Sequence, residues 1–141
     1  MTQSLPNAIA ALVAHARTCT DIKYAPDQPL DNIGVFPFAV VYLERGQIMA
    51  EGAGQSRNIS SVIVEFHLNR VLLASAVEAG TLYIEEFGDL LTNDPTLGGT
   101  CDAIPMGAGE NVTFELGRLE WNGVQTIGVR FHVPVKIRRA V

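Results

Sequence analysis

The chain has few charged residues for its size, only two cysteines and no long apolar run. Charged residues make up 18% of its 141 residues, whereas a typical soluble domain has about 25%. Because so little charge is available to keep the surface in water, we expect part of that surface to be buried against other subunits. A monomer with a large core is the alternative explanation of the same composition.

The cysteines and the hydropathy argue against several classes of protein. Cys19 and Cys101 lie outside any CxxC pattern and away from paired histidines, so a zinc site is not expected. No apolar run approaches the roughly 18 residues of a membrane span, and the first residues lack the basic region of a secretory signal. We therefore expect a protein made in a reducing cytoplasm, with free thiols and no membrane partner.

Motifs that carry catalysis are also lacking. No HxxxH, HxH or ExxH spacing involves His15, His67 or His132, and there is neither a GxSxG elbow nor a phosphate-binding glycine loop. The adjacent Glu85 and Glu86 lie about 100° apart on a predicted helix and do not converge. We predict no enzyme activity, no metal and no cofactor, and we expect His67 and His132 to be partly exposed sheet residues.

The first half of the chain contains signals for one helix and two strands. Residues 5–17 are predicted to form an amphipathic helix, capped by Ser4 and with Pro6 in its first turn. Residues 35–46 are apolar at both parities, which indicates a strand covered on two sides. Residues 60–70 alternate and predict a half-buried strand. The intervening residues 47–58 contain two glycines and are predicted to be a long loop that reaches a partner.

The second half predicts a helix followed by a hairpin. A helix is expected within residues 71–91, with an apolar stripe made of Leu73, Val77, Ile84, Phe87 and Leu91. A strand over residues 111–121 leads into Asn122-Gly123, a type I′ turn signal. The apolar phase slips at Gly117-Arg118, which predicts a β-bulge. We thus predict an α+β fold: a single domain over residues 1–141, with a mainly antiparallel four-stranded sheet and two helices packed on it.

The formal net charge of −5 is unevenly distributed along the chain. Residues Glu78 to Glu120 include nine acids and one base, whereas Arg130 to Arg139 include four bases and no acid. This asymmetry suggests two surfaces of opposite sign, although two ordinary solvated faces would give the same pattern. Four bases form a small phosphate footprint, so recognition of a DNA sequence is not indicated.

The final strand, residues 126–138, places apolar residues at every second position and bases between them. Pro134 lacks a backbone N–H, which favours an edge position for this strand or else places the missing N–H towards an open edge. Its basic face is expected to meet either the acid-rich segment of a neighbouring subunit or DNA. The candidate interface residues come from the predicted loop and this strand: Gln55, Arg57, Asn58, Arg130, His132, Lys136 and Arg138.

The order of these segments resembles the tail terminator proteins of long-tailed bacteriophages and of phage-like gene transfer agents. The resemblance is carried by FPFAVVY, SSVIVEFHLNR, the helix that ends in LLTNDPTLGGTCD, and the closing GVRFHVPVKI, and it covers nearly the whole chain. The most distinctive piece is DPTLGGTCD, residues 94–102. Asn69-Arg70 is followed by Val-Leu-Leu, where a more polar helix entry is expected.

This resemblance implies a structural virion protein without enzyme activity or cofactor. It implies a hexameric ring that closes the head-proximal end of the tail tube and joins it to the head. The ring would contact the major tail tube protein, a neck or connector protein, and genomic DNA passing through its channel. It would be assembled in the host cytoplasm. The alternatives are another neck or head-tail completion protein and, from a different class, a small-molecule-binding or enzymatic domain.

Overall fold

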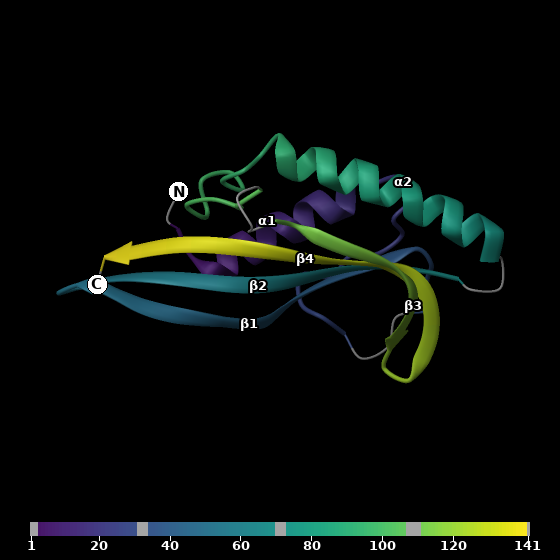
Figure 1. The fold of residues 1–141 in the computed structure, drawn as a ribbon. Coiled ribbons are helices and arrows are strands. Elements are labelled where there is room, and N and C mark those ends of the chain that lie inside the picture. Colours follow the sequence, from purple (N-terminus) through teal and green to yellow (C-terminus); the bar gives the residue numbers. More distant parts are fainter. Residues whose placement is uncertain (1–2, 31–33, 70–72, 107–110, 141) are drawn as a thin grey trace.

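Two helices lie on one face of a four-stranded antiparallel sheet, as the sequence predicts (Figure 1). The computed structural model describes residues 3–30, 34–69, 73–106 and 111–140. The elements follow in the order α1 (Leu5–Thr18), β1 (Phe38–Gly52), β2 (Gln55–Leu68), α2 (Leu73–Thr92), β3 (Thr113–Trp121) and β4 (Val124–Ala140). Together they form one compact α+β domain. Arg70 and residues 71–72, which the sequence assigns to a strand end and a helix start, lie outside the described residues.

The sheet order is β1-β2-β4-β3, so β4 is an interior strand and its predicted edge position is wrong. Residues Gln55 to Leu68 pair with one side of β4, and β3 pairs with the other side as far as His132. The backbone of Lys136 bonds towards residues 102 and 103 on the β3 side. Alternate residues of a strand direct their backbone N–H groups to the same side of the strand. The nitrogen of Pro134, like that of Lys136, therefore faces the β3 side, in the gap beyond the end of β3.

The predicted loop over residues 47–58 is also wrong, because this segment is a β-hairpin. Strand β1 continues to Gly52, and β2 begins at Gln55. The turn uses Gly52 and Gly54, whose φ angles of 143° and 73° are favourable for glycine. The two strands stay paired along their whole length, with register shifts between Leu43 and Arg45 and between Ala50 and Gly52.

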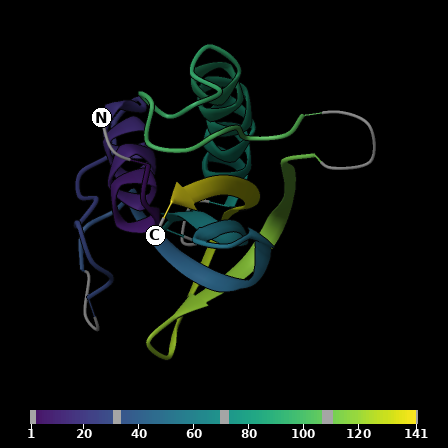
Figure 2. The same cartoon turned by 90° about the vertical axis from the view of Figure 1, so that its left-hand side faces the viewer.

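The helices bury their apolar faces side by side against the sheet (Figure 2). The side chain of Ser4 caps α1 by accepting a hydrogen bond of 3.2 Å from the Asn7 N–H, as predicted. In the predicted stripe of α2, Phe87 and Leu91 are buried as expected, whereas Leu73 and Val77 are exposed. The residues of α2 that are buried are Ala76, Gly80, Tyr83, Phe87 and Leu91.

Strand β2 is buried on both faces from Val62 to Leu68, so its predicted half-exposure is wrong. On the helix side, Phe66 contacts Tyr83, Phe87 and Phe131, with ring centroids 5.0–5.7 Å apart. On the opposite side, the buried His67 stacks on Phe38 at 4.6 Å.

The hairpin of β3 and β4 has the predicted turn but lacks the predicted bulge. Asn122 and Gly123 have φ angles of 50° and 81°, as a type I′ turn requires. The pairing runs without a register shift from Thr113 to Trp121. The apolar residues of β3 change parity because the strand packs on both of its faces. Leu116 packs on the face covered by the helices, whereas Trp121 lies beside His67 on the opposite face.

We predict opposite effects of the same substitution at two glycines. A Cβ at Gly128 would lie 1.9 Å from the carbonyl oxygen of Phe66, whereas a Cβ at Gly88 meets nothing within 4 Å. Gly128→Ala should therefore lower the free energy of unfolding by about 3 kcal/mol, and Gly88→Ala should raise it by about 1 kcal/mol. Urea denaturation measures both, and equal effects of the two variants would contradict this packing.

Candidate assembly surface on the sheet arm

One end of the sheet extends beyond both helices as a three-stranded arm (Figure 1). We define the arm as residues 44–52 of β1, 55–61 of β2 and 134–140 of β4, which stay in register to its end. Every residue from Leu43 to Gln55 is exposed. Val135 and Ile137 of the arm belong to the core, whereas its β1 strand and its turn are exposed and contribute nothing to the core. The arm is therefore the part of the fold with the strongest reason to have a partner.

Two large apolar side chains lie near the tip of the arm. Ile48 is 74% exposed and Met49 is 39% exposed. Consecutive residues of a strand point to opposite faces, so each face of the arm carries one of them. Ile48 pairs with Asn58, which shares its face with the buried Ile137, so Ile48 lies on the face that the helices cover elsewhere. Neither residue is among the interface residues predicted from the sequence.

The arm is basic, although the whole chain is acidic. It contains the five bases Arg45, Arg57, Lys136, Arg138 and Arg139 and the two acids Glu44 and Glu51. Arg57 Nε is 2.7 Å from a Glu51 carboxylate oxygen, and Arg138 Nε is 3.7 Å from one of Asp102. Arg45 makes only a 3.9 Å contact with Glu44, and its side chain is 85% exposed. The arm therefore presents positive charge beside its apolar tip.

A buried carboxylate fastens the strands together where the arm begins. Glu65 is 1% exposed and accepts hydrogen bonds from Tyr42 Oη at 2.7 Å and from Arg130 Nε at 2.7 Å. Its other oxygen lies 2.8 Å from His67 Nε2, and His67 Nδ1 lies 2.6 Å from Thr126 Oγ1. These contacts join β1, β2 and β4 in one network. His67 is thus a fully buried member of this network, contrary to the predicted partial exposure.

The environment of Glu65 favours its ionised form. Burial acts to raise the pKa of this carboxyl, but the hydrogen bonds from His67, Tyr42 and Arg130 outweigh burial and hold the pKa below its usual value. The phenol of Tyr42 shows the converse effect, since burial and its bond to the Glu65 carboxylate raise its pKa. Glu65 is therefore held as a carboxylate that is paired with the Arg130 guanidinium, and the network fastens the sheet.

The structure divides the predicted interface residues into two groups. Gln55, Arg57, Asn58, Lys136 and Arg138 all lie on the arm. The other two, Arg130 and His132, lie at its base.

The two residues at the base contact acids of their own chain. Besides its bond to Glu65, Arg130 lies 3.7 Å from Glu115, and His132 lies 3.2 Å from the same Glu115 oxygen. Glu115 and Asp102 belong to the acid-rich segment, so part of the expected pairing of basic strand and acidic segment occurs within one subunit. Contact of the seven residues with another subunit remains a prediction.

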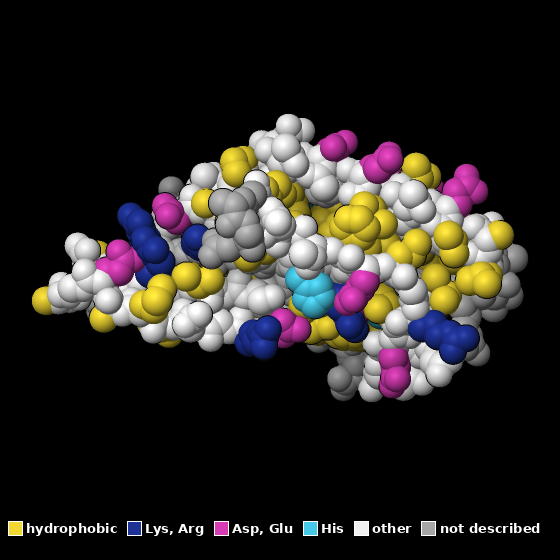
Figure 3. All heavy atoms as spheres, in the orientation of Figure 1, with side chains coloured by type: hydrophobic (Ala, Val, Ile, Leu, Met, Phe, Trp, Pro, Cys, Tyr) yellow, Lys and Arg dark blue, Asp and Glu magenta, His cyan; other side chains and the backbone are white. Residues whose placement is uncertain are grey.

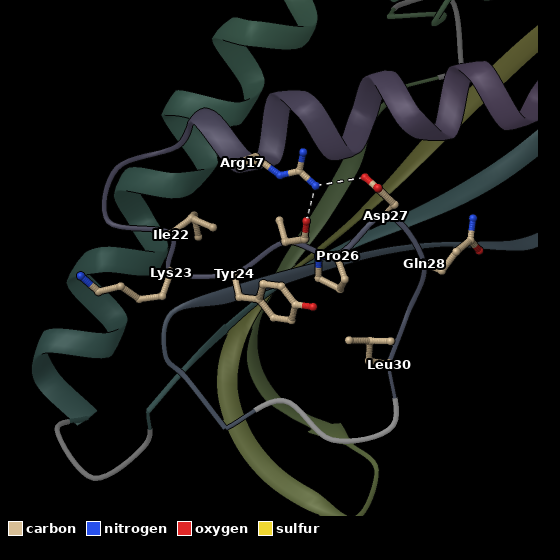
Figure 4. A pocket seen from close by; sticks show the side chains of 9 residues that line it. Arg17, Ile22, Lys23, Tyr24, Pro26, Asp27, Gln28 and Leu30 are labelled. Carbon is tan, nitrogen blue, oxygen red and sulfur yellow. Dashed lines mark hydrogen bonds and ion pairs between the residues drawn. The ribbon is translucent and has the colours of Figure 1, made fainter.

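A hollow with a volume of about 610 Å³ lies elsewhere. It is formed by residues 22–30 beside the end of α1, with Tyr24 and Leu30 among its walls (Figure 4). Arg17 Nη2 donates to the Ala25 carbonyl at 2.6 Å and to the Asp27 carboxylate at 3.1 Å. The Arg17 and Asp27 side chains therefore hold the loop against α1. The polar side chains that line the hollow do not converge as those of an active site would.

No family model matches the chain, and no curated protein matches it in sequence. Among the described residues, no helix is long and apolar enough to cross a membrane, and no group of three or more His, Cys, Asp or Glu side chains is arranged to hold a metal ion. Cys19 and Cys101 are free and buried, and burial raises the pKa of their thiols to about 12 and about 11.

We predict that Glu65 makes stability depend on acid pH. Because its pKa is lowered by folding, its contribution is fully present above the usual value of 4.5 and is lost as the pH falls through the lower folded-state pKa. Glu65→Gln should lower the free energy of unfolding at pH 7 by about 3 kcal/mol and weaken its pH dependence below 4.5. Urea denaturation at several pH values measures both effects.

Asp102→Asn is the control for this experiment. The pair of Asp102 with Arg138 is half exposed, so its loss should cost less than about 1 kcal/mol. Equal effects of the two substitutions would contradict the fastening role of Glu65.

Proposed function

We propose that the chain is the subunit of a tail terminator: a virion protein that forms a ring on the head-proximal end of a phage or gene-transfer-agent tail. The observation that carries this proposal is the projecting basic arm with its apolar tip. The arm is one surface of the subunit, and a contact with a different surface of the next copy is heterologous. Such contacts close into rings or extend into filaments.

The most distinctive segment of the resemblance, residues 94–102, has a structural role in the fold. Leu97 and Cys101 are 1% exposed, and Asp94 Oδ1 accepts a 2.8 Å hydrogen bond from the Gly98 N–H. The carbonyl of Thr100 accepts from the Ser4 N–H at the start of α1, and the Asp102 N–H donates to the Lys136 carbonyl on the arm. The segment thus joins α1 to the arm, which supports a role in fixing the shape of an assembly subunit.

The partners of the ring follow from the same proposal. The neighbouring subunits, the major tail tube protein and a neck or connector protein would share the surfaces of the ring. The face of the arm opposite the helices carries Arg57, Lys136 and Arg138, and this charge suits either acidic protein surfaces or the phosphates of DNA in the channel. The protein would act in the virion, at the head-proximal end of the tail, after assembly in the host cytoplasm.

We predict that a charge at the tip of the arm blocks assembly without unfolding the subunit. Ile48→Glu changes a side chain that is 74% exposed, so the free energy of unfolding should change by less than about 0.5 kcal/mol. In particles in which every copy of the chain carries Ile48→Glu, tails should exceed their normal length and fail to join heads. Electron microscopy gives the tail lengths, and urea denaturation gives the stability.

The control is Leu82→Glu, which makes the same change at a side chain of α2 that is 54% exposed and should leave tails normal. Normal tails with Ile48→Glu would refute a role of the arm in termination. Tails of normal length that fail only to join heads would instead identify the chain as a neck or completion protein.

A further inference from the structure

An apolar groove with acidic side chains on its rim lies between α2 and β3. Its volume is about 470 Å³, and its apolar walls and floor are Ile84, Gly88, Met106, Val112, Phe114 and Phe131. Phe114 is 54% exposed and Met106 is 44% exposed, although both line the groove together with the buried Phe131. Figure 3 shows hydrophobic side chains gathered beneath α2, with acidic side chains along the helix above them.

The acids on this rim have no ion-pair partner among the described residues. Glu85 and Asp89 are exposed, line the groove and lie one turn apart on α2. Helix α2 carries four acids and no base between Leu73 and Thr92. The groove therefore favours an occupant that has an apolar side chain and a positive charge close together.

The arm has both features. On the helix side of the arm, Ile48 is paired across the sheet with Asn58, which is paired in turn with Ile137. Arg139 lies two residues beyond Ile137 and therefore on the same face. Arg139 is exposed, so an exposed apolar side chain and a base share one surface. The charges are opposite in sign to those of the rim, and the two exposed apolar surfaces would be removed from water together.

A subunit cannot place its own arm in its own groove. Phe131 forms the groove floor, and Ile137 is level with Ile48 across the sheet. These two residues are six positions apart on β4, which is roughly 20 Å at 3.3 Å per residue. The sheet pairing holds this separation. Residues 102–103 also bond to Lys136 between the two sites. An arm that occupies this groove is therefore the arm of a second copy of the chain.

A small-molecule ligand fits the groove less well. Among the described residues, every buried side-chain nitrogen and oxygen has a hydrogen-bond partner. The groove thus offers no buried polar group to select a ligand, and its carboxylates lie at the rim in contact with water.

We infer that the arm of one subunit docks into the α2–β3 groove of the next, with Ile48 inside the groove and Arg139 beside Glu85 and Asp89. This inference rests on the proposed ring and identifies the two surfaces that form its heterologous contact. An apolar side chain at the centre of the contact with charged pairs at its rim is typical of protein interfaces. Because the charged pairs lie at the rim, salt should weaken the association.

Mixed disulfide formation tests the contact. The variants Ile48→Cys and Gly88→Cys each carry one exposed thiol, and Gly88 tolerates a side chain because a Cβ there meets nothing within 4 Å. The native Cys19 and Cys101 are buried and give little background. Under mild oxidation, a mixture of the two variants should form about ten times more linked dimer than either variant alone, because docking raises the effective thiol concentration. The double variant should give a ladder that ends at the number of subunits in the ring.

Filling the groove provides a second, independent measurement. Gly88→Leu should reduce association of the otherwise unchanged protein about tenfold or more, because its side chain occupies the site of Ile48. Gly88→Ala, which leaves the groove open, is the matched control and should associate normally. Association is measured as the assembled mass, with and without the tail tube protein.

The outcomes separate this inference from the proposed function. Normal assembled mass without the mixed disulfide would overturn the docking site and leave the ring intact. Equal cross-linking of Ile48→Cys alone would show an arm-to-arm contact and would also overturn it. A chain that stays monomeric and unlinked, with the tail tube protein present, would overturn both proposals.

Discussion

The difference in length between the strands and the helices is the constraint on which the rest of this structure depends. Strand β4 has 17 residues and would span roughly 56 Å if straight, whereas α1 and α2, with 14 and 20 residues, span roughly 21 and 30 Å. The helices pack side by side on one face (Figure 2), so they cannot cover the whole sheet. The remainder is the arm, and its exposed position follows directly from these lengths.

The arm is also held in one conformation before it meets a partner. The Glu65 network ties three strands at its base, and continuous pairing carries their register to the tip. A preformed surface loses little conformational entropy on association. Its basic charge and the acidic groove rim on α2 lie on different parts of the subunit, an arrangement that favours head-to-tail contacts over self-pairing of identical surfaces.

Features encoded by neighbouring residues were predictable from the sequence, whereas those set by distant contacts were not. The Ser4 cap and the Asn122-Gly123 turn are local signals, and both are present. The sequence of residues 47–58 predicts a loop because strands with polar residues on both faces lack alternation. Pairing of β1 with β2, and of β2 with β4, determines the conformation of this segment. The burial of Glu65 was missed because its compensating donor, Arg130, is 65 residues away in the chain.

The mass of the native chain in solution, measured over a range of concentrations with and without the tail tube protein, tests the central claim most directly. We predict a closed assembly with one defined number of subunits, which becomes weaker at high salt because charges at the rim of the contact are screened. A chain that remains monomeric at every concentration, even in the presence of the tube protein, would contradict the assignment of the arm as an assembly surface.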